Sequence, residues 1–465
     1  MPFNPKLEDT VLYSVLGGSR RDPVLVLGGG IAGLGVARGL SARGHSVIVI
    51  DAEREIGGTH RSRVFGPYTF DLGSIFYEEE ALIFQVFPGL RDLCPRVMRL
   101  ERRLSPQGEV LNHPIDPRDV QAWSLPRRAA ALADLAWSRM IRRSDGSLEG
   151  ICLHKLGRRV FEGTGLRNYL LRFNHTEPAL IDEEFFYRRM VFLDRLAQPG
   201  RMLPILWRGL ISQGATMAEG QALRVRPSEG FEALFDPVRR MLVASGVRFE
   251  LGAPIRRIRR EGGSYLVTTD RDEFRGCCVV SAMPLDTCHR AVFGKESGLK
   301  SLDILTLFVS AQSIAASFGT VIYNFHAQGR WKRATVYSRL YPGLGAGREF
   351  MSVELTLPHG GAADPEEAFA DLSNHLGGLN LGVGDLRLEG YEVIKSAYPY
   401  NLTGQADAAT PVLKSLEDFG IVAVGRQGRF EYLPTASGVL KRVNHELALA
   451  AARMQLGNQQ PADAA

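Results

Sequence analysis

The chain has 465 residues, of which 45% are hydrophobic and 23% are charged, and its net charge is +5. These values are ordinary for a soluble globular protein with two or three domains. The densest basic stretches, 96–103 and 256–260, are interrupted by apolar residues at helix or strand spacing, which favours solvated faces over a nucleic-acid surface.

The five cysteines form neither a CxxC pair nor a cluster with histidine. This argues against a disulfide scaffold and a metal site, and it favours a reducing compartment. Residues 1–20 contain no signal-peptide core, and no apolar run reaches the ~18 residues of a transmembrane segment. A cytoplasmic location is therefore expected.

Taken in chain order, the pattern begins with a peripheral arm at 1–22 and a strand, turn, helix and strand between 24 and 51. Residues 78–225 are irregular and rich in arginine and aromatic side chains. The later expected elements are a helical patch at 126–143, a helix and strand between 227 and 258, strands at 265–269 and 279–283, alternating strands at 305–311, 335–340 and 350–357, a strand at 421–424 and a helix at 437–454.

The most informative motif is the glycine-rich turn in VLVLGGGIAGLGVARGL, residues 24–40. A G-x-G-x-x-G motif alone is weak, but this one follows a buried strand and opens a helix. Gly28 permits the tight turn, Gly30 lets the backbone approach a pyrophosphate, and Gly33 lets the helix pack on the strand. The helix N-terminus then offers unpaired N–H groups to phosphates.

The second strand ends in Asp51, 18 residues after Gly33. A carboxylate there accepts a hydrogen bond from the adenosine ribose, whereas an arginine would suggest a 2′-phosphate. The first 51 residues therefore predict a dinucleotide-binding site.

A second glycine pair, Gly57-Gly58, follows in EIGGTHRSRVFGPYTFDLGSIFY, residues 55–77. The order of GxGxxG, acid, GG and D-L-G resembles the superfamily of flavin amine oxidases, protoporphyrinogen oxidase-like proteins and UDP-galactopyranose mutases. The resemblance extends to PSEG at 227–230 and SAMP at 281–284. It implies FAD, held by a Rossmann-type α/β domain of the GR2-like kind into which a mixed α+β substrate domain is inserted.

The C-terminal motif VGRQGRFEYLP, 424–434, together with AYPYN at 397–401 and HPID at 113–116, looks like the mutase and protoporphyrinogen-oxidase-like branch. The resemblance covers most of 23–452 and is vague between 120 and 220. We also expect the helix near Ser437 to direct its N-terminus at the flavin. The cofactor-binding residues predicted in this way are Gly28, Gly30, Ile31, Ala32, Gly33, Asp51, Gly57, Gly58, Thr59, Arg61, Ser62, Gly73, Ser74, Ile255, Gly425, Arg426, Ser437 and Gly438.

Two departures weaken the mutase interpretation. Leu433-Pro434-Thr435-Ala436 supplies no acid after the final tyrosine, and Ile75 occupies a position where the mutases keep histidine. The arginines and tyrosines that hold a sugar diphosphate in the mutases have the candidate counterparts Arg189, Arg339, Tyr398, Arg429 and Tyr432.

No catalytic acid or base stands out, and His60, His113 and His175 are more simply interpreted as loop or packing residues. The favoured hypothesis is a FAD-dependent oxidoreductase acting on a small anionic or sugar-derived metabolite. The alternatives are a mutase that uses reduced FAD on a nucleotide sugar, and a non-catalytic FAD-binding protein. A small-molecule substrate is the expected partner, and a homodimer is left open.

The expected cofactor domain consists of 23–77, 227–290 and 415–452. The expected substrate domain consists of 78–226 and 291–414, and 453–465 form a flexible tail. We expect the flavin ring at the junction of the two domains.

Overall fold

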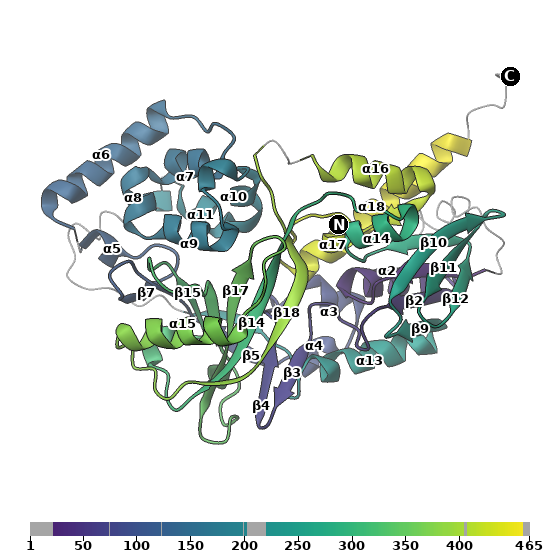
Figure 1. The fold of residues 1–465 in the computed structure, drawn as a ribbon, viewed down its shortest axis with the longest axis horizontal. Helices are drawn as coiled ribbons and strands as arrows, with labels where there is room; N and C mark the ends of the chain where they lie inside the picture. Colours follow the sequence, from purple (N-terminus) through teal and green to yellow (C-terminus); the bar gives the residue numbers. More distant parts are fainter. Residues whose placement is uncertain are drawn as a thin grey trace.

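The computed structural model describes residues 22–73, 75–121, 123–198, 200–201, 220–403 and 407–458, with backbone alone for 451–458. The predicted arm, Ser74 and most of the predicted tail therefore lie outside the described residues. A parallel sheet and its helices form one unit, and a larger, mostly antiparallel sheet with a group of helices forms the other (Figure 1).

The first unit is built on a five-stranded parallel sheet in the order β19-β13-β1-β2-β9. The sheet combines strands that are far apart in sequence. Its strands are β1 (Val24–Leu27), β2 (Val47–Asp51), β9 (Val247–Leu251), β13 (Cys278–Ser281) and β19 (Ile421–Ala423).

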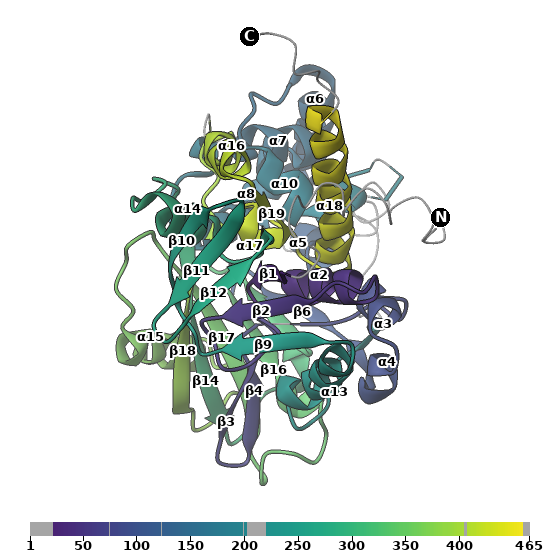
Figure 2. The same cartoon turned by 90° about the vertical axis from the view of Figure 1, so that its right-hand side faces the viewer.

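Both faces of this sheet are covered, which explains why β1 is a continuous apolar run. Val24 and Val26 pack with the helices α2 (Ile31–Ser41), α13 (Phe231–Ala244) and α18 (Ala436–Asn458). Leu25 and Leu27 pack on the other side, in a core shared with the antiparallel strands β10–β12 (Figure 2). The elements on that side are β10 (Ile255–Glu261), β11 (Ser264–Thr269), β12 (Glu273–Gly276), α14 (Leu285–Phe293) and α16 (Ala409–Phe419).

The second unit contains a seven-stranded sheet in the order β18-β14-β17-β16-β15-β6-β7. One core joins it to α15 (Pro365–Gly378), and another joins it to a group of short helices. The strands are β6 (Glu101–Leu104), β7 (Val110–Asn112), β14 (Ser301–Ala311), β15 (Val321–Asn324), β16 (Arg333–Val336), β17 (Glu349–Leu357) and β18 (Arg387–Pro399).

The helical group lies beside one end of this sheet (Figure 1). It accounts for much of the region that the sequence pattern left irregular. Its helices are α5 (Pro117–Gln121), α6 (Leu125–Ile141), α7 (Leu148–Leu156), α8 (Arg158–Gly163), α9 (Leu166–Asn174), α10 (Glu184–Arg189) and α11 (Val191–Leu196), with a 3₁₀ turn at Pro178–Leu180. No helix among the described residues is long and apolar enough to cross a membrane.

Two expectations about this sheet were wrong. The strand expected at 335–340 ends at Val336 and gives way to a 3₁₀ turn, Tyr337–Arg339. The alternating burial expected for β14 is absent, because all eleven of its residues are buried. A sheet covered on both faces buries successive side chains alike, so alternation disappears.

The parallel-sheet unit contains more of the chain than its five strands. Residues 81–94 pack in its core. The helix α16 begins at Ala409 and packs with β19. At the C-terminus, α18 continues to Asn458.

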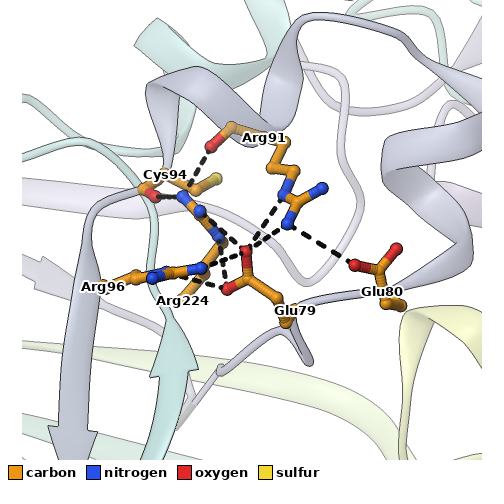
Figure 3. Close-up of polar contacts among 6 residues, drawn as sticks. All are labelled: Glu79, Glu80, Arg91, Cys94, Arg96 and Arg224. Carbon is orange, nitrogen blue, oxygen red and sulfur yellow. Dashed lines mark hydrogen bonds and ion pairs between the residues drawn. The ribbon is translucent and has the colours of Figure 1, made fainter.

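A glutamate with three arginine partners fastens the segment after β4 (Tyr68–Asp71) to two strands and a helix (Figure 3). Glu79 accepts hydrogen bonds from Arg91 of α4 (Leu90–Leu93), from Arg96 of β5 (Arg96–Arg99) and from Arg224 of β8 (Gln221–Arg224). Arg224 also donates to the carbonyls of Arg91 and Cys94, at 2.9 and 2.6 Å, and so caps the end of α4. These hydrogen bonds lower the pKa of the Glu79 carboxyl.

We expect Glu79→Gln to lower Tm by a few degrees without loss of cofactor, because an amide cannot replace a carboxylate shared by three guanidinium groups. The difference in Tm between the wild type and Glu79→Gln should shrink as the pH falls. A carboxylate whose pKa is lowered in the folded state stops stabilising that state once it is protonated. Glu80→Gln is the matched control, because Glu80 is 77% exposed and makes one contact to Arg91, at 3.5 Å. Equal thermal midpoints for the two variants would contradict this role.

Candidate functional site

The first glycine turn has the geometry that its sequence predicts. Gly28 has φ +106°, and a Cβ there would lie 3.2 Å from the backbone of Ala282 and Met283. A Cβ on Gly33 would lie 1.8 Å from the Gly28 carbonyl oxygen, so the helix and the turn touch without side chains between them. The next helix, α2, begins with no capping side chain and no acid in its first turn, which leaves its N-terminus suited to an anion.

Asp51 and the second glycine turn both contact the first glycine turn. The Asp51 carboxylate accepts hydrogen bonds from the N–H groups of Gly29, at 2.5 Å, and Glu53, at 2.8 Å. Burial raises the pKa of Asp51, and these N–H groups oppose the shift. Gly57 donates to the Gly29 carbonyl at 2.8 Å, and a Cβ on Gly58 would lie 3.0 Å from the Gly30 Cα. The backbones of the two turns are therefore in contact.

The polar residues after the second turn are mostly engaged with protein. Thr59 lies in the turn and is half-buried. Arg61 is buried and pairs with Glu53 at 2.5 Å. The Ser62 hydroxyl donates to Asp71 at 2.6 Å and accepts from the Phe231 N–H at 3.0 Å, so it connects the hairpin to α13.

The remaining predicted cofactor residues lie at three places. The carbonyl of Gly73 accepts a hydrogen bond from Tyr337 at 3.3 Å, and Ile255 begins β10. At the start of α18, the Ser437 hydroxyl accepts from the Leu82 N–H at 2.9 Å, and the Gly438 N–H donates to Thr435 at 3.0 Å.

Gly425 brings the C-terminal motif onto the first glycine turn. It has φ +74°, and a Cβ there would lie 2.4 Å from the Cβ of Ala32. The following short helix, α17 (Gly425–Gly428), carries Arg426 toward the second unit, where its guanidinium donates to the Ala397 carbonyl. Arg426 therefore connects the segment at Gly425, which touches the first glycine turn, to the residues predicted to bind substrate.

Three of the five predicted substrate residues meet beside Arg426. The Arg189 guanidinium carbon lies 4.7 Å from the ring centroid of Tyr398 and 4.9 Å from that of Tyr432. Arg426 lies 4.9 and 5.9 Å from the same two rings. Arg189, Tyr398 and Tyr432 line one cavity.

Sequence reasoning missed three charged residues that complete this cluster. Lys332 precedes β16 and lies 4.8 Å from the Tyr398 ring, and Arg333 follows it. Both pair with Glu354 of β17, at 3.2 and 2.5 Å. The available signal was the single acid in the apolar strand FMSVELTL, because a lone buried carboxylate requires cationic partners.

Arg339 and Arg429 lie outside this cluster. Arg339 donates to backbone carbonyls of residues 314–316 and 319, and so closes a loop of the sheet. Arg429 pairs with Glu446 at 2.8 Å and with Glu431 at 3.4 Å.

Comparison with known families identifies this arrangement. A model of the family described as flavin containing amine oxidoreductase matches residues 31–310. The chain belongs to the flavin containing amine oxidoreductase family. Its cofactor is FAD, and it is a FAD-dependent enzyme. No curated protein matches the chain.

Solved structures with the same fold come from several members of this superfamily. Reduced UDP-galactopyranose mutase matches with a TM-score of 0.74 and 16% identity, covering 94% of this chain and 99% of that one. A putative protoporphyrinogen oxidase from Exiguobacterium sp. 255-15 has a TM-score of 0.68 and 16% identity, covering 94% and 100%. Putrescine oxidase bound to putrescine has a TM-score of 0.54 and 13% identity, covering 93% and 99%.

The residues present fit FAD. Gly28, Gly30, Gly57, Gly58 and Gly425 bring backbone without Cβ atoms together beside the N-terminus of α2, which has no capping side chain. Buried polar atoms without a hydrogen-bond partner in the described structure include Nδ1 of His60, Nε of Arg61 and Nε of Arg426. Such atoms are rare in proteins, and they suit a polar cofactor with phosphate and hydroxyl groups.

The three histidines considered from the sequence have packing environments. His60 is enclosed by aromatic rings, and burial together with Arg426 lowers its pKa to about 4. His113 stacks on Tyr323 with ring centroids 4.0 Å apart. The His175 Nε2 lies 2.8 Å from the Thr356 carbonyl.

Proposed function

We propose that this protein is a FAD-dependent oxidoreductase that oxidises a small anionic metabolite. The observation that carries the proposal is an excess of positive charge beside the cofactor loop. Arg189, Lys332, Arg333 and Arg426 all lie near Tyr398, and the three arginines also act on Tyr432. Glu354 is the one carboxylate paired with any of these four cations among the described residues. An anionic substrate supplies the missing negative charge.

The cluster explains how a substrate can be held without a catalytic acid or base. FAD, when bound, supplies a hydride acceptor, and that chemistry needs a substrate C–H bond placed over the flavin. Arg189 and Arg426 bind the anionic group, while Tyr398 and Tyr432 form the walls of the cavity and exclude water. Arg426 follows Gly425, which touches the first glycine turn, so the same short segment would hold both the cofactor and the anionic group.

We propose that the cofactor is bound by the two glycine turns, Asp51 and Gly425, which lie together at the start of α2. The α2 N-terminus binds the pyrophosphate, and Asp51 binds the adenosine ribose. Ser62 has a structural role in addition, because its hydroxyl is shared between Asp71 and Phe231.

The proposal is tested by anaerobic reduction. Purified holoprotein is mixed with anionic and neutral candidate metabolites, and the flavin absorbance is followed in the absence of oxygen. We expect an anionic compound to bleach the flavin and its neutral analogue to fail, with recovery on admitting an acceptor. Failure of every anionic class to bleach the flavin would contradict the proposal.

The tyrosines favour a second candidate, a redox-neutral rearrangement of a nucleotide sugar of the kind that UDP-galactopyranose mutase is named for. Aromatic rings and arginines together suit a sugar diphosphate. Against it stand Ile75 and the absence of an acid between Leu433 and Ala436. A single anaerobic reduction separates the two: sustained turnover of a nucleotide sugar without an acceptor would overturn the oxidoreductase.

We expect Asp51→Ala to weaken FAD binding by about 1–3 kcal/mol, because a charge-assisted hydrogen bond to the ribose is lost. The variant also removes the acceptor for the N–H groups of Gly29 and Glu53, which can destabilise the protein itself. The thermal midpoints of the variant and the wild type should therefore be compared in the absence of FAD. Asp51→Asn is the informative partner, since it keeps one acceptor oxygen and removes the charge. FAD dissociation constants from flavin fluorescence measure the effect, and an unchanged constant in both variants would refute the ribose contact.

A further inference from the structure

The cation cluster contains more positive charge than its protein partners neutralise. Lys332 and Glu354 have side chains 1% and 2% exposed, and Arg333 shares that glutamate. Arg189 and Arg426 have no carboxylate within ion-pair distance among the described residues, and one guanidinium nitrogen of Arg189 is buried without a hydrogen-bond partner. Both arginines are half-buried, and charge that is partly removed from water without a counter-ion is costly, so the free enzyme requires another source of negative charge.

Tyr398 lies at the centre of this cluster. Its ring centroid is 4.7 Å from Arg189, 4.8 Å from Lys332 and 4.9 Å from Arg426, from three different segments. The ring is 9% exposed and lines the cavity. Opposite charges at this distance favour the ionised form of an acidic group. A phenolate here would face three cations at once.

The charged and titratable groups that act on Tyr398 come from several of the elements around it, while α9 and β14 pack on it through Phe173 and Leu302. Arg189 belongs to α10, Arg426 to α17, and Tyr432 to the segment that follows α17. The other three are Lys332, Arg333 and Glu354, from the start of β16 and from β17.

Burial would raise the pKa of the Tyr398 hydroxyl, but Lys332, Arg189 and Arg333 lower it to about 7, against the opposing effect of Glu354. Tyr432, whose ring lies 5.8 Å from that of Tyr398, has a raised pKa because its burial outweighs the same arginines. The cations therefore favour the ionised form of Tyr398 more than that of Tyr432.

We propose that Tyr398 is an exchangeable counter-ion: its phenolate neutralises the cluster while the site holds no substrate, and it takes up one proton from solvent when an anionic substrate replaces it. This inference rests on the proposed function, which places an anionic substrate at this cluster. It adds that substrate binding is coupled to proton uptake, with no covalent bond made or broken.

The coupling fixes the pH dependence of anion binding. The bound state holds one more proton than the free state above the pKa of about 7. Affinity is therefore constant below that pH and falls about tenfold for each unit above it. A site built from arginines and lysine alone would show no such fall near neutrality.

Inorganic sulfate is a suitable probe, because its own charge is constant between about pH 6 and pH 9, so any titration belongs to the protein. Sulfate binding to the FAD-loaded protein is measured by calorimetry in two buffers of different ionisation enthalpy. At pH 8 we expect uptake of close to one proton per sulfate bound. Tyr398→Phe should bind sulfate with no proton uptake and with a pH-independent affinity, whereas Tyr432→Phe should keep the wild-type uptake.

A second measurement needs neither turnover nor a variant. In an ultraviolet pH titration of the FAD-loaded wild-type protein, we expect one tyrosinate step near pH 7, which saturating sulfate moves to higher pH. The proposal is overturned if wild-type protein binds sulfate without proton uptake, if Tyr398→Phe takes up as many protons as wild type, or if sulfate does not bind. Because none of these measurements involves flavin reduction, their outcome is separable from that of the proposed oxidation.

Discussion

Replacing Gly30 by valine should abolish FAD binding while leaving the protein folded. Gly30 has an ordinary extended backbone, with φ −76° and ψ −179°, which a β-branched residue adopts without strain. A Cβ there would meet only Gly58, at 3.5 and 3.8 Å, which is normal contact. The glycine is therefore not required by the protein alone, and the space beside it is available for a pyrophosphate.

The size of the effect follows from losing close contact between the pyrophosphate and the backbone N–H groups of α2. We expect a loss of about 3 kcal/mol or more, which is a factor of over 100 in FAD affinity. Flavin content after purification and FAD titration of the apoprotein measure it. A Gly30→Val protein with stoichiometric FAD would show that this turn does not hold the cofactor.

Two further glycines of the same helix serve as controls. Gly39→Val places its side chain beside the flexible end of Arg43, where the Cβ would lie 3.4 Å from a guanidinium nitrogen, and should keep FAD. Gly33→Ala should instead destabilise the whole protein by about 3 kcal/mol, because its Cβ would lie 1.8 Å from the Gly28 carbonyl oxygen. Circular dichroism and flavin content together distinguish loss of cofactor from loss of fold.

The cofactor unit could be predicted from the sequence because its requirements are local. Gly28 must have positive φ and Gly33 must touch the preceding turn, and both needs fall within six residues of one strand. Gly57 lies close in sequence to the same turn and binds it through a backbone hydrogen bond. Patterns of this kind depend on backbone sterics and therefore survive where sequence identity to solved structures is 16%.

The proposed substrate cluster could be predicted only in part, because it is assembled from distant segments. Tyr398 and Tyr432 were found through the motifs that contain them, whereas Arg333 and Glu354 lie in strands whose pairing the sequence does not display. Arg339 illustrates the converse, since an arginine in a polar context can bind backbone carbonyls instead of a ligand. The sequence alone does not show which arginines bind backbone carbonyls and which are free to bind a ligand.

The helical region between 117 and 196 was hardest to interpret, because its short helices are stabilised mainly by packing on the seven-stranded sheet. Several of them have no side-chain cap, so the signals that mark helix ends in a sequence are absent. Ser147 of α7 is an exception, since its hydroxyl accepts from the Gly150 N–H at 2.9 Å.

Replacing Arg189 by methionine should raise the KM for the anionic substrate by roughly 100-fold, equivalent to about 2.7 kcal/mol for the loss of one buried charged contact. Stability should change by no more than about 1 kcal/mol. The variant loses a cation stacked 3.8 Å from the Phe173 ring, but it also removes a buried charge that has no carboxylate partner, and methionine packs well on aromatic rings.

Arg339→Met is the matched comparison, and it should have the opposite effects. Four backbone carbonyl oxygens lose their donor when Arg339 is replaced, so Tm should fall, while the KM stays within twofold of wild type. Steady-state kinetics and thermal unfolding, with each variant loaded with FAD, give the KM and the Tm of both variants. An unchanged KM in Arg189→Met would mean that the positive charge of Arg189 does not bind the substrate. The cluster would then not be the substrate site.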